Sequence, residues 1–153
     1  LAQTYPAPRD PGDLSHPAMA DLDGDGDLEV VFAVDQAVYA IHHTGAVLPG
    51  WPVALGIFYD NAPAIADLDG DGSVEIVLTS FANSNGGTNA VHVLNRTGQL
   101  QWTKPMPGGV MNSPALADVD RDGTFEIFLC TNGGIGVESL LHGLCRHPRR
   151  CSG

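Results

Sequence analysis

The chain has 153 residues and a formal net charge of −11, because 18 acidic side chains outnumber seven basic ones. An acid excess of this size excludes nucleic acid and anionic membrane surfaces as general electrostatic partners. No apolar run approaches the roughly 18 residues of a membrane-inserted helix, so we expect no membrane insertion. With 19 glycines and 11 prolines, the composition favours turns and short strands over long helices.

Short apolar runs between turn signals predict strands along most of the chain. The runs in the first third cover residues 17–20, 28–34, 37–41 and 46–48. The runs in the second third cover residues 74–80, 90–94 and 99–102. No window has apolar residues at helical spacing, so the sequence predicts an all-β fold.

Three segments align with one another without gaps, over residues 16–32, 62–78 and 113–129. Successive copies are 46 and 51 residues apart, and units of this length with four short strands are typical of β-propeller blades. The sequence therefore predicts a partial β-propeller of about three four-stranded blades, a fragment of a larger propeller. The expected units cover residues 5–50, 51–101 and 102–143, followed by a divergent basic tail over 144–153.

Each aligned segment contains an acidic loop of the form D-x-D-x-D-G-x-x-E. Crowded carboxylates repel one another unless a cation lies among them, and hard oxygen ligands of this kind prefer Ca²⁺. The glycine at position 6 permits a sharp turn, and the carbonyl of position 7 is a natural further ligand. We expect about three Ca²⁺ ions, held by carboxylates at positions 1, 3, 5 and 9 and by the carbonyl at position 7. These predicted ligands are Asp21, Asp23, Asp25, Asp27 and Glu29; Asp67, Asp69, Asp71, Ser73 and Glu75; and Asp118, Asp120, Asp122, Thr124 and Glu126.

Other interpretations of these loops fit less well. An EF-hand needs a bidentate glutamate at position 12, where this chain has Phe32, Leu78 and Leu129. No histidine or cysteine lies within a loop, which argues against Zn²⁺. A single such loop could be a solvated Asx turn, but three copies in the same strand context favour Ca²⁺.

The pattern P-A-x-A-D-L-D-G-D-G-x-x-E-I-V, recurring about every 50 residues, resembles the FG-GAP and VCBS repeats. The resemblance covers roughly residues 5–137 and is closer to the bacterial style of repeat than to integrins, because no Phe-Gly pair precedes Pro-Ala. It implies blades of a Ca²⁺-binding propeller in which the acidic loop joins the first two strands and carries the ligands named above. Arg121 replaces the glycine at position 4 of the third loop, and we expect binding to survive there.

Aromatic residues recur 16 positions before each loop, as Tyr5, Trp51 and Trp102. They could stack on sugars, but their fixed place in the repeat favours packing between blades. The sequon Asn95-Arg96-Thr97 is interpreted as turn chemistry rather than as a glycosylation site.

Histidines and cysteines lie outside the acidic loops. We expect His42, His43 and His92 to be solvated and Cys130 to be a small buried apolar residue. A cluster in the tail (His142, Cys145, His147 and Cys151) has a spacing that is not typical of a Zn²⁺ site.

The sequence predicts a non-catalytic, Ca²⁺-binding propeller module of a secreted or cell-surface bacterial protein, used for adhesion or ligand recognition. Its expected partners are a protein or carbohydrate ligand, together with the remaining blades of a parent propeller or a second copy of the chain. Two alternatives stay open: part of the propeller domain of a secreted Ca²⁺-dependent polysaccharide lyase, and a structural spacer attached to a secreted hydrolase. A lyase needs basic residues to bind uronates, and before the tail the chain has only Arg9, Arg96, Lys104 and Arg121. Because the chain begins at Leu1 without a signal-like leader, we also expect an interior piece of a longer protein.

Overall fold

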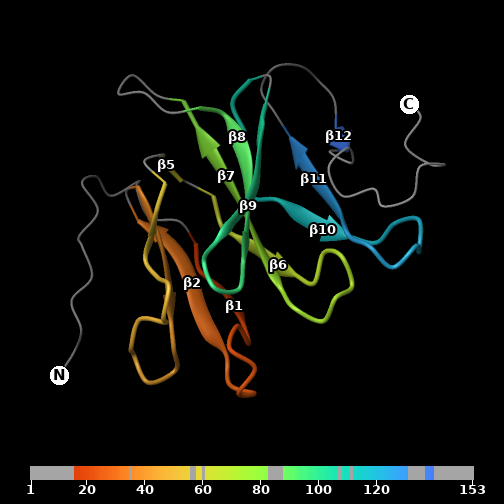
Figure 1. Ribbon diagram of the computed structural model, residues 1–153. Helices are drawn as coiled ribbons and strands as arrows, with labels where there is room; N and C mark the ends of the chain where they lie inside the picture. Colours follow the sequence, from red (N-terminus) through yellow and green to blue (C-terminus); the bar gives the residue numbers. More distant parts are fainter. Residues whose placement is uncertain are drawn as a thin grey trace.

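The computed structural model describes residues 16–34, 36–55, 58–59, 61–82, 88–106, 108–110, 112–130 and 137–139. Within these ranges the regular structure consists of twelve antiparallel β-strands in three sheets, without a helix (Figure 1). The all-β prediction is confirmed. Across the same ranges, no helix has the length and apolar character that a bilayer-spanning helix needs.

The first sheet has the strand order β1-β2-β3-β4. Its strands are β1 (Ala18–Ala20), β2 (Glu29–Val34), β3 (Ala37–Ile41) and β4 (Val53–Ala54). The predicted strand over 46–48 is wrong, because only Val47 forms a bridge, to Ile41. The chain turns at Gly50, whose φ is 90°, and the fourth strand then begins at Val53, which pairs with Val38.

The second and third sheets repeat this arrangement. The second contains β5 (Phe58–Tyr59), β6 (Ala64–Ala66), β7 (Glu75–Phe81), β8 (Ala90–Asn95) and β9 (Leu100–Pro105), and both β5 and β6 pair with β7. The third contains β10 (Ala115–Ala117), β11 (Glu126–Cys130) and β12 (Val137–Ser139). The predicted unit limits at residues 50 and 101 stay a prediction, although the outermost strands of the first two sheets extend beyond them.

The first strands of the three sheets are spatial neighbours, because β6 lies close to both β1 and β10. The sheets fan outward from these strands, so successive sheets lie face to face (Figure 1). The chain is therefore an unclosed, partial β-propeller whose repeat units form consecutive blades.

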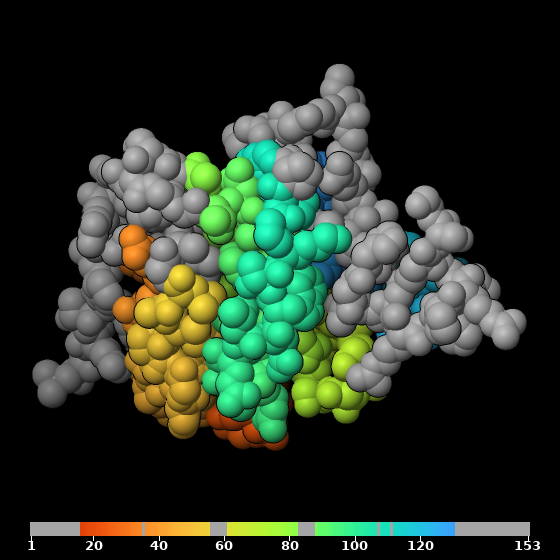
Figure 2. Space-filling model, turned by 45° about the horizontal axis from the view of Figure 1, so that its top comes forward, coloured from red at the N-terminus to blue at the C-terminus, as the bar shows by residue number. Residues whose placement is uncertain are grey.

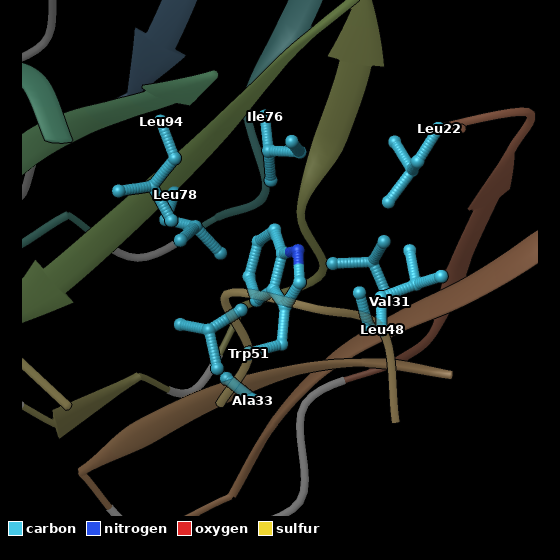
Figure 3. Close-up of a cluster of buried hydrophobic side chains, with 10 residues drawn as sticks. Leu22, Val31, Ala33, Leu48, Trp51, Ile76, Leu78 and Leu94 are labelled. Carbon is cyan, nitrogen blue, oxygen red and sulfur yellow. The ribbon is translucent and has the colours of Figure 1, made fainter. Parts of the chain in front are cut away.

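Two apolar clusters fill the spaces between successive blades. In the first, Trp51 lies between side chains of the first sheet, such as Val31, and side chains of the second, such as Ile76 and Leu78 (Figure 3). The second cluster joins Val77 and Val91 of the second sheet to Ile127 and Leu129 of the third, and Trp102 packs against it. The prediction that Trp51 and Trp102 pack between blades is confirmed, whereas Tyr5 lies outside the described residues.

The turn regions of the first two units also meet directly (Figure 2). A Cβ atom at Gly50 would lie 2.4 Å from the carbonyl oxygen of Thr97, and one at Gly98 would lie 2.7 Å from Val53 Cγ2. Both positions have positive φ as well, so only glycine fits this contact. The turn interpretation of Asn95 is confirmed, because its Oδ1 accepts hydrogen bonds from the amides of Thr97 and Gln99.

Candidate metal centres

The three acidic loops connect β1 to β2, β6 to β7, and β10 to β11, and they lie along one edge of the fan of sheets (Figure 1). In each loop, carboxylate oxygens of three aspartates lie within 4.8 Å of one another. The three groups are Asp21, Asp23 and Asp25; Asp67, Asp69 and Asp71; and Asp118, Asp120 and Asp122. The structure therefore brings together all the aspartates predicted at positions 1, 3 and 5, in three clusters that could each hold a cation.

The aspartate at position 1 shapes its loop by accepting backbone hydrogen bonds. In the second loop, Asp67 Oδ1 accepts from the amides of Gly70 and Asp71, at 2.8 and 3.1 Å, and its Oδ2 accepts from the amide of Gly72 at 2.8 Å. Equivalent bonds run from Gly24 and Gly26 to Asp21, and from Asp122 and Gly123 to Asp118. These bonds hold each loop in a tight turn and so preorganise the carboxylates that face one another.

The aspartate at position 5 accepts a hydrogen bond from the amide of position 7 in all three loops. The distances are 2.9 Å from Asp27 to Asp25, 2.8 Å from Ser73 to Asp71 and 3.0 Å from Thr124 to Asp122. The bond from the Asp27 amide, followed by one from His42, lowers the pKa of Asp25 below its ordinary value of 3.8. Asp25 is therefore ionised at neutral pH and available to a cation.

The glutamate at position 9 lies beneath its loop, at the start of the following strand. Glu29 and Glu126 are 0% and 4% exposed. In each unit, Oε2 of the glutamate accepts a hydrogen bond from the amide of position 2, over 2.8 to 2.9 Å: Leu22 to Glu29, Leu68 to Glu75, and Val119 to Glu126. Burial, with smaller contributions from the three nearby aspartates, raises the pKa of Glu75. Glu75 is half-buried, and a cation in the loop would offset the repulsion between its carboxylate and the three aspartates.

Two positions in each loop have a left-handed backbone conformation. Position 6 is glycine in all three loops, with φ between 89° and 93°. Position 4 also has positive φ, with Gly24 at 84° and Gly70 at 74°, whereas Arg121 adopts 60°. The sequence indicates a departure from glycine at Arg121 but not this left-handed backbone. An L-residue with a long side chain is strained in this conformation.

The donor atoms in the three clusters are carboxylate oxygens, the kind of ligand that a hard divalent cation such as Ca²⁺ prefers. The aspartates at positions 1, 3 and 5 would hold the ion, and the ion would remove their mutual repulsion. The glutamates at position 9 and the carbonyls of Asp27, Ser73 and Thr124 stay predicted ligands.

Two histidines that follow β3 lie against the first loop. The expectation that both are solvated holds for His43, whose side chain is 43% exposed, and is wrong for His42, whose side chain is 19% exposed. His42 Nε2 is 3.2 Å from Asp25 Oδ2, and His43 Nδ1 is 3.4 Å from Asp27 Oδ2. The contact joins residues 17 positions apart on different elements, so neither the loop motif nor its spacing predicts it. One feature of the sequence could have drawn attention to His42. In the alignment of the repeats, Asn95 occupies the place of His42 in the second unit, so the histidine is particular to the first unit.

Two further expectations about single side chains are wrong. His92 is only 4% exposed, because it lies on β8 in the centre of the second sheet, and its ring nitrogens contact Ser80 Oγ and Thr103 Oγ1. Cys130 is exposed, because it is the last residue of β11. The His/Cys cluster of the tail lies outside the described residues.

A small pocket opens beside the second loop. Its volume is about 170 Å³, and it is lined by Leu68, Asp69, Asp71, Glu75, Val93, Gln101 and Trp102. The carboxylates of Asp69, Asp71 and Glu75, all from the second acidic loop, thus line the same pocket as the indole of Trp102.

Repeated blades with an acidic loop after the first strand define a class of propeller repeats, and comparison with known proteins identifies the family. The FG-GAP-like repeat matches residues 21–78 and 67–129. Because the matches cover more than half of the chain, this protein belongs to the FG-GAP-like repeat family.

Solved structures include a similar fold in the V. cholerae biofilm matrix protein Bap1. The identity is 25% over 86% of this chain and 24% of that chain, with a TM-score of 0.61. The chain thus spans about a quarter of the length of Bap1. BBS1N in complex with ARL6DN also matches, with 11% identity over 79% of this chain and 50% of that chain, but its TM-score of 0.37 carries no argument. No curated protein matches the sequence.

Proposed function

We propose that this chain is a Ca²⁺-binding, non-catalytic propeller module of an extracellular bacterial protein, used for adhesion or ligand recognition. The observation that carries the proposal is the threefold recurrence of one arrangement: three clustered aspartates beside a glutamate that accepts from the amide of position 2, in a loop held by backbone hydrogen bonds. The similarity to a biofilm matrix protein supports the extracellular role.

Ca²⁺ acts here as a structural element. Filling three loops would change the formal charge from −11 to −5, because each ion adds two positive charges. Since the ion binds the folded loop, its binding free energy adds to the stability of the fold. A loop filled at 100 times its Kd gains about 2.7 kcal/mol, which corresponds to roughly 5–10 °C in Tm for a chain of this size.

Val119 supports the presence of a further blade against the third loop. Leu22 and Leu68, at position 2 of the first two loops, are 2% and 0% exposed because each packs into the core of the next blade. Val119 holds the same position in the third loop and is 61% exposed. We propose that another repeat, from the same protein or a second copy, covers it in the assembled molecule.

A non-catalytic role is supported by the functions that basic side chains have in the structure. The guanidinium of Arg96 donates a hydrogen bond to the carbonyl of Leu22 at 3.2 Å, which ties the second blade to the first. Arg121 lies in the third acidic loop among carboxylates. Incubation with uronate-containing polysaccharides should therefore release no unsaturated products, and their release would identify the lyase alternative as correct.

The recognition role is tested by retention of biofilm polysaccharide on the immobilised chain, in Ca²⁺ and in a chelator. We expect retention in Ca²⁺, loss in the chelator, and loss in a variant in which Asp67, Asp69 and Asp71 beside the Trp102 pocket are changed to Asn. Retention that neither the chelator nor the variant alters would contradict a Ca²⁺-dependent recognition module.

A further inference from the structure

The first blade contains a second group of metal-ligating side chains, beside its aspartate cluster. Ligand atoms of Asp25, Glu29, His42 and His43 all lie within 4.8 Å of one another. The two imidazole rings are stacked at a tilt, with centroids 3.9 Å apart, at the end of β3. This group differs from the acidic loops because two of its donors are nitrogens.

An independent observation at Glu29 points to a missing ligand. Its side chain is 0% exposed, and its Oε1 has no hydrogen-bond partner among the described residues, although Oε2 accepts from the amide of Leu22. A buried carboxylate oxygen without a partner is costly. Since Glu29 belongs to the histidine-containing group, a cation bound there would satisfy this oxygen.

We propose that Asp25, Glu29, His42 and His43 form a site for a transition-metal ion of the Zn²⁺ type, which shares Asp25 and Glu29 with the first Ca²⁺ loop. Imidazole nitrogens with carboxylate oxygens are a typical Zn²⁺ donor set, with four ligands at about 2.0–2.2 Å. Tetrahedral ligands at that distance are about 3.4 Å apart, so the side chains need to close by no more than about 1.4 Å.

The surroundings of His42 fit a metal ligand. Its Nδ1 lies 2.9 Å from Thr44 Oγ1, and its Nε2 faces Asp25. In the metal-free chain the amide of Thr44 donates to Nδ1 at 3.3 Å, so Nε2 carries the proton and donates to Asp25. A metal on Nε2 would replace that proton, and Nδ1–H would then donate to the Thr44 hydroxyl, which orients the ring. The group also contains two carboxylates, and three further acids surround it in the loop (Asp21, Asp23 and Asp27), so five negative charges face the four positive charges of two divalent ions.

The second blade lacks this site and provides its natural control. Alignment of residues 38–45 with 91–98 places Asn95 at the position of His42 and Arg96 at the position of His43. Asn95 makes the turn hydrogen bonds and Arg96 bonds to the carbonyl of Leu22, so neither position there serves a metal. A variant with His42→Asn and His43→Arg therefore copies a turn that this chain already folds.

The test is calorimetric titration of Zn²⁺ into the full chain in saturating Ca²⁺. The background carries Cys130→Ser, Cys145→Ser and Cys151→Ser, which removes thiolates as Zn²⁺ ligands. We expect one equivalent of Zn²⁺, bound at least tenfold more weakly when His42→Asn and His43→Arg are added. Co²⁺, used as a spectroscopic probe, should give visible bands of tetrahedral nitrogen and oxygen ligation that the added changes abolish.

Equal Zn²⁺ affinity in both proteins would overturn the proposal, because the two histidines would then contribute no ligand. The Ca²⁺ stoichiometry of the histidine variant tests the proposed function separately, on protein whose fold is checked by circular dichroism. About three equivalents of Ca²⁺ are expected there whether or not the Zn²⁺ site exists. If that variant loses its fold, His42→Asn alone in the same titration decides, with loss of Zn²⁺ affinity expected and unchanged affinity overturning the site.

Discussion

The amide of Leu22 donates a hydrogen bond to the buried carboxylate of Glu29, and this bond couples the acidic loop to the packing of the next blade. Asp21, one residue earlier, belongs to the aspartate cluster, whereas the side chain of Leu22 lies in the core that joins the first two blades. Of these two consecutive residues, Asp21 is therefore a predicted cation ligand and Leu22 packs in the interface between blades. The same arrangement recurs at Leu68, so a cation in either loop stabilises the contact between two blades.

Replacing the half-buried carboxylate of Glu75 should stabilise the metal-free chain and weaken its response to Ca²⁺. In Glu75→Gln the amide oxygen can still accept from the Leu68 amide, but the charge is lost. Because burial raises the pKa of Glu75, the metal-free fold loses stability as pH rises through that pKa and the carboxylate ionises. We expect a higher Tm in chelator at pH 7 and a smaller increase in Tm on adding Ca²⁺.

The control for that measurement is Asp27→Asn, which removes one charge from a side chain that is 65% exposed. It should leave the Ca²⁺-induced increase in Tm nearly unchanged, because the predicted ligand at position 7 is the backbone carbonyl. An identical response of the two variants would show that Glu75 has no special role in the response to Ca²⁺.

The strain at Arg121 predicts a stabilising substitution. Arg121→Gly relieves a left-handed residue with φ 60° and removes a positive charge from the third loop. We expect the free energy of unfolding to rise by about 1 kcal/mol and Ca²⁺ to bind the third loop more tightly. The measurement is urea unfolding together with Ca²⁺ titration.

The matched control for Arg121 is Gly24→Ala in the first loop. Its φ is 84° and an added Cβ contacts nothing within 4 Å, so the cost comes from the backbone conformation alone. We expect a loss of about 1 kcal/mol. If both variants left stability unchanged, the left-handed conformation at position 4 would be refuted.

The repeat and its loops could be predicted from sequence because their determinants are local. The D-x-D-x-D-G-x-x-E spacing places three aspartates together, and the continuous apolar run over 37–41 predicts β3 with its observed limits. Features that depend on contacts between elements could not be predicted. The fourth strand at Val53 depends on the turn at Gly50, and the approach of His42 to Asp25 depends on how β3 pairs with β2.

The difference between Val119 and its counterparts predicts how the chain tolerates a charge. Leu68→Lys should cost several kcal/mol, because it buries an unpaired charge between the second and third blades. Val119→Lys should leave the free energy of unfolding within about 0.5 kcal/mol, since this side chain is 61% exposed. Self-association measured by ultracentrifugation should decrease in Val119→Lys if a second copy covers this surface.

The buried imidazole of His92 predicts an acid-dependent loss of stability. The hydroxyl of Ser80 donates to the carbonyl of Thr88, so it accepts from Nε2–H of His92, and Nδ1 accepts from Thr103. Burial lowers the pKa of His92 from 6.5 to about 4. The stabilising effect of the neutral ring is therefore present above pH 6.5 and is lost as pH falls toward 4.

Across that range, the wild-type chain should lose up to about 3 kcal/mol more than His92→Gln. The measurement compares the pH dependence of unfolding in the two proteins, in excess Ca²⁺, so that the acidic loops contribute equally. Parallel curves would show that His92 is not the titrating group.

The central claim is that all three acidic loops are Ca²⁺ sites, and a calorimetric Ca²⁺ titration of the chelator-stripped chain tests it most directly. We predict about three equivalents of bound Ca²⁺, and one equivalent fewer when Asp67, Asp69 and Asp71 are all changed to Asn. Circular dichroism on the same sample reports whether the metal-free chain keeps its strands. A folded chain that binds no Ca²⁺, or a stoichiometry that the triple change leaves unaltered, would contradict the account.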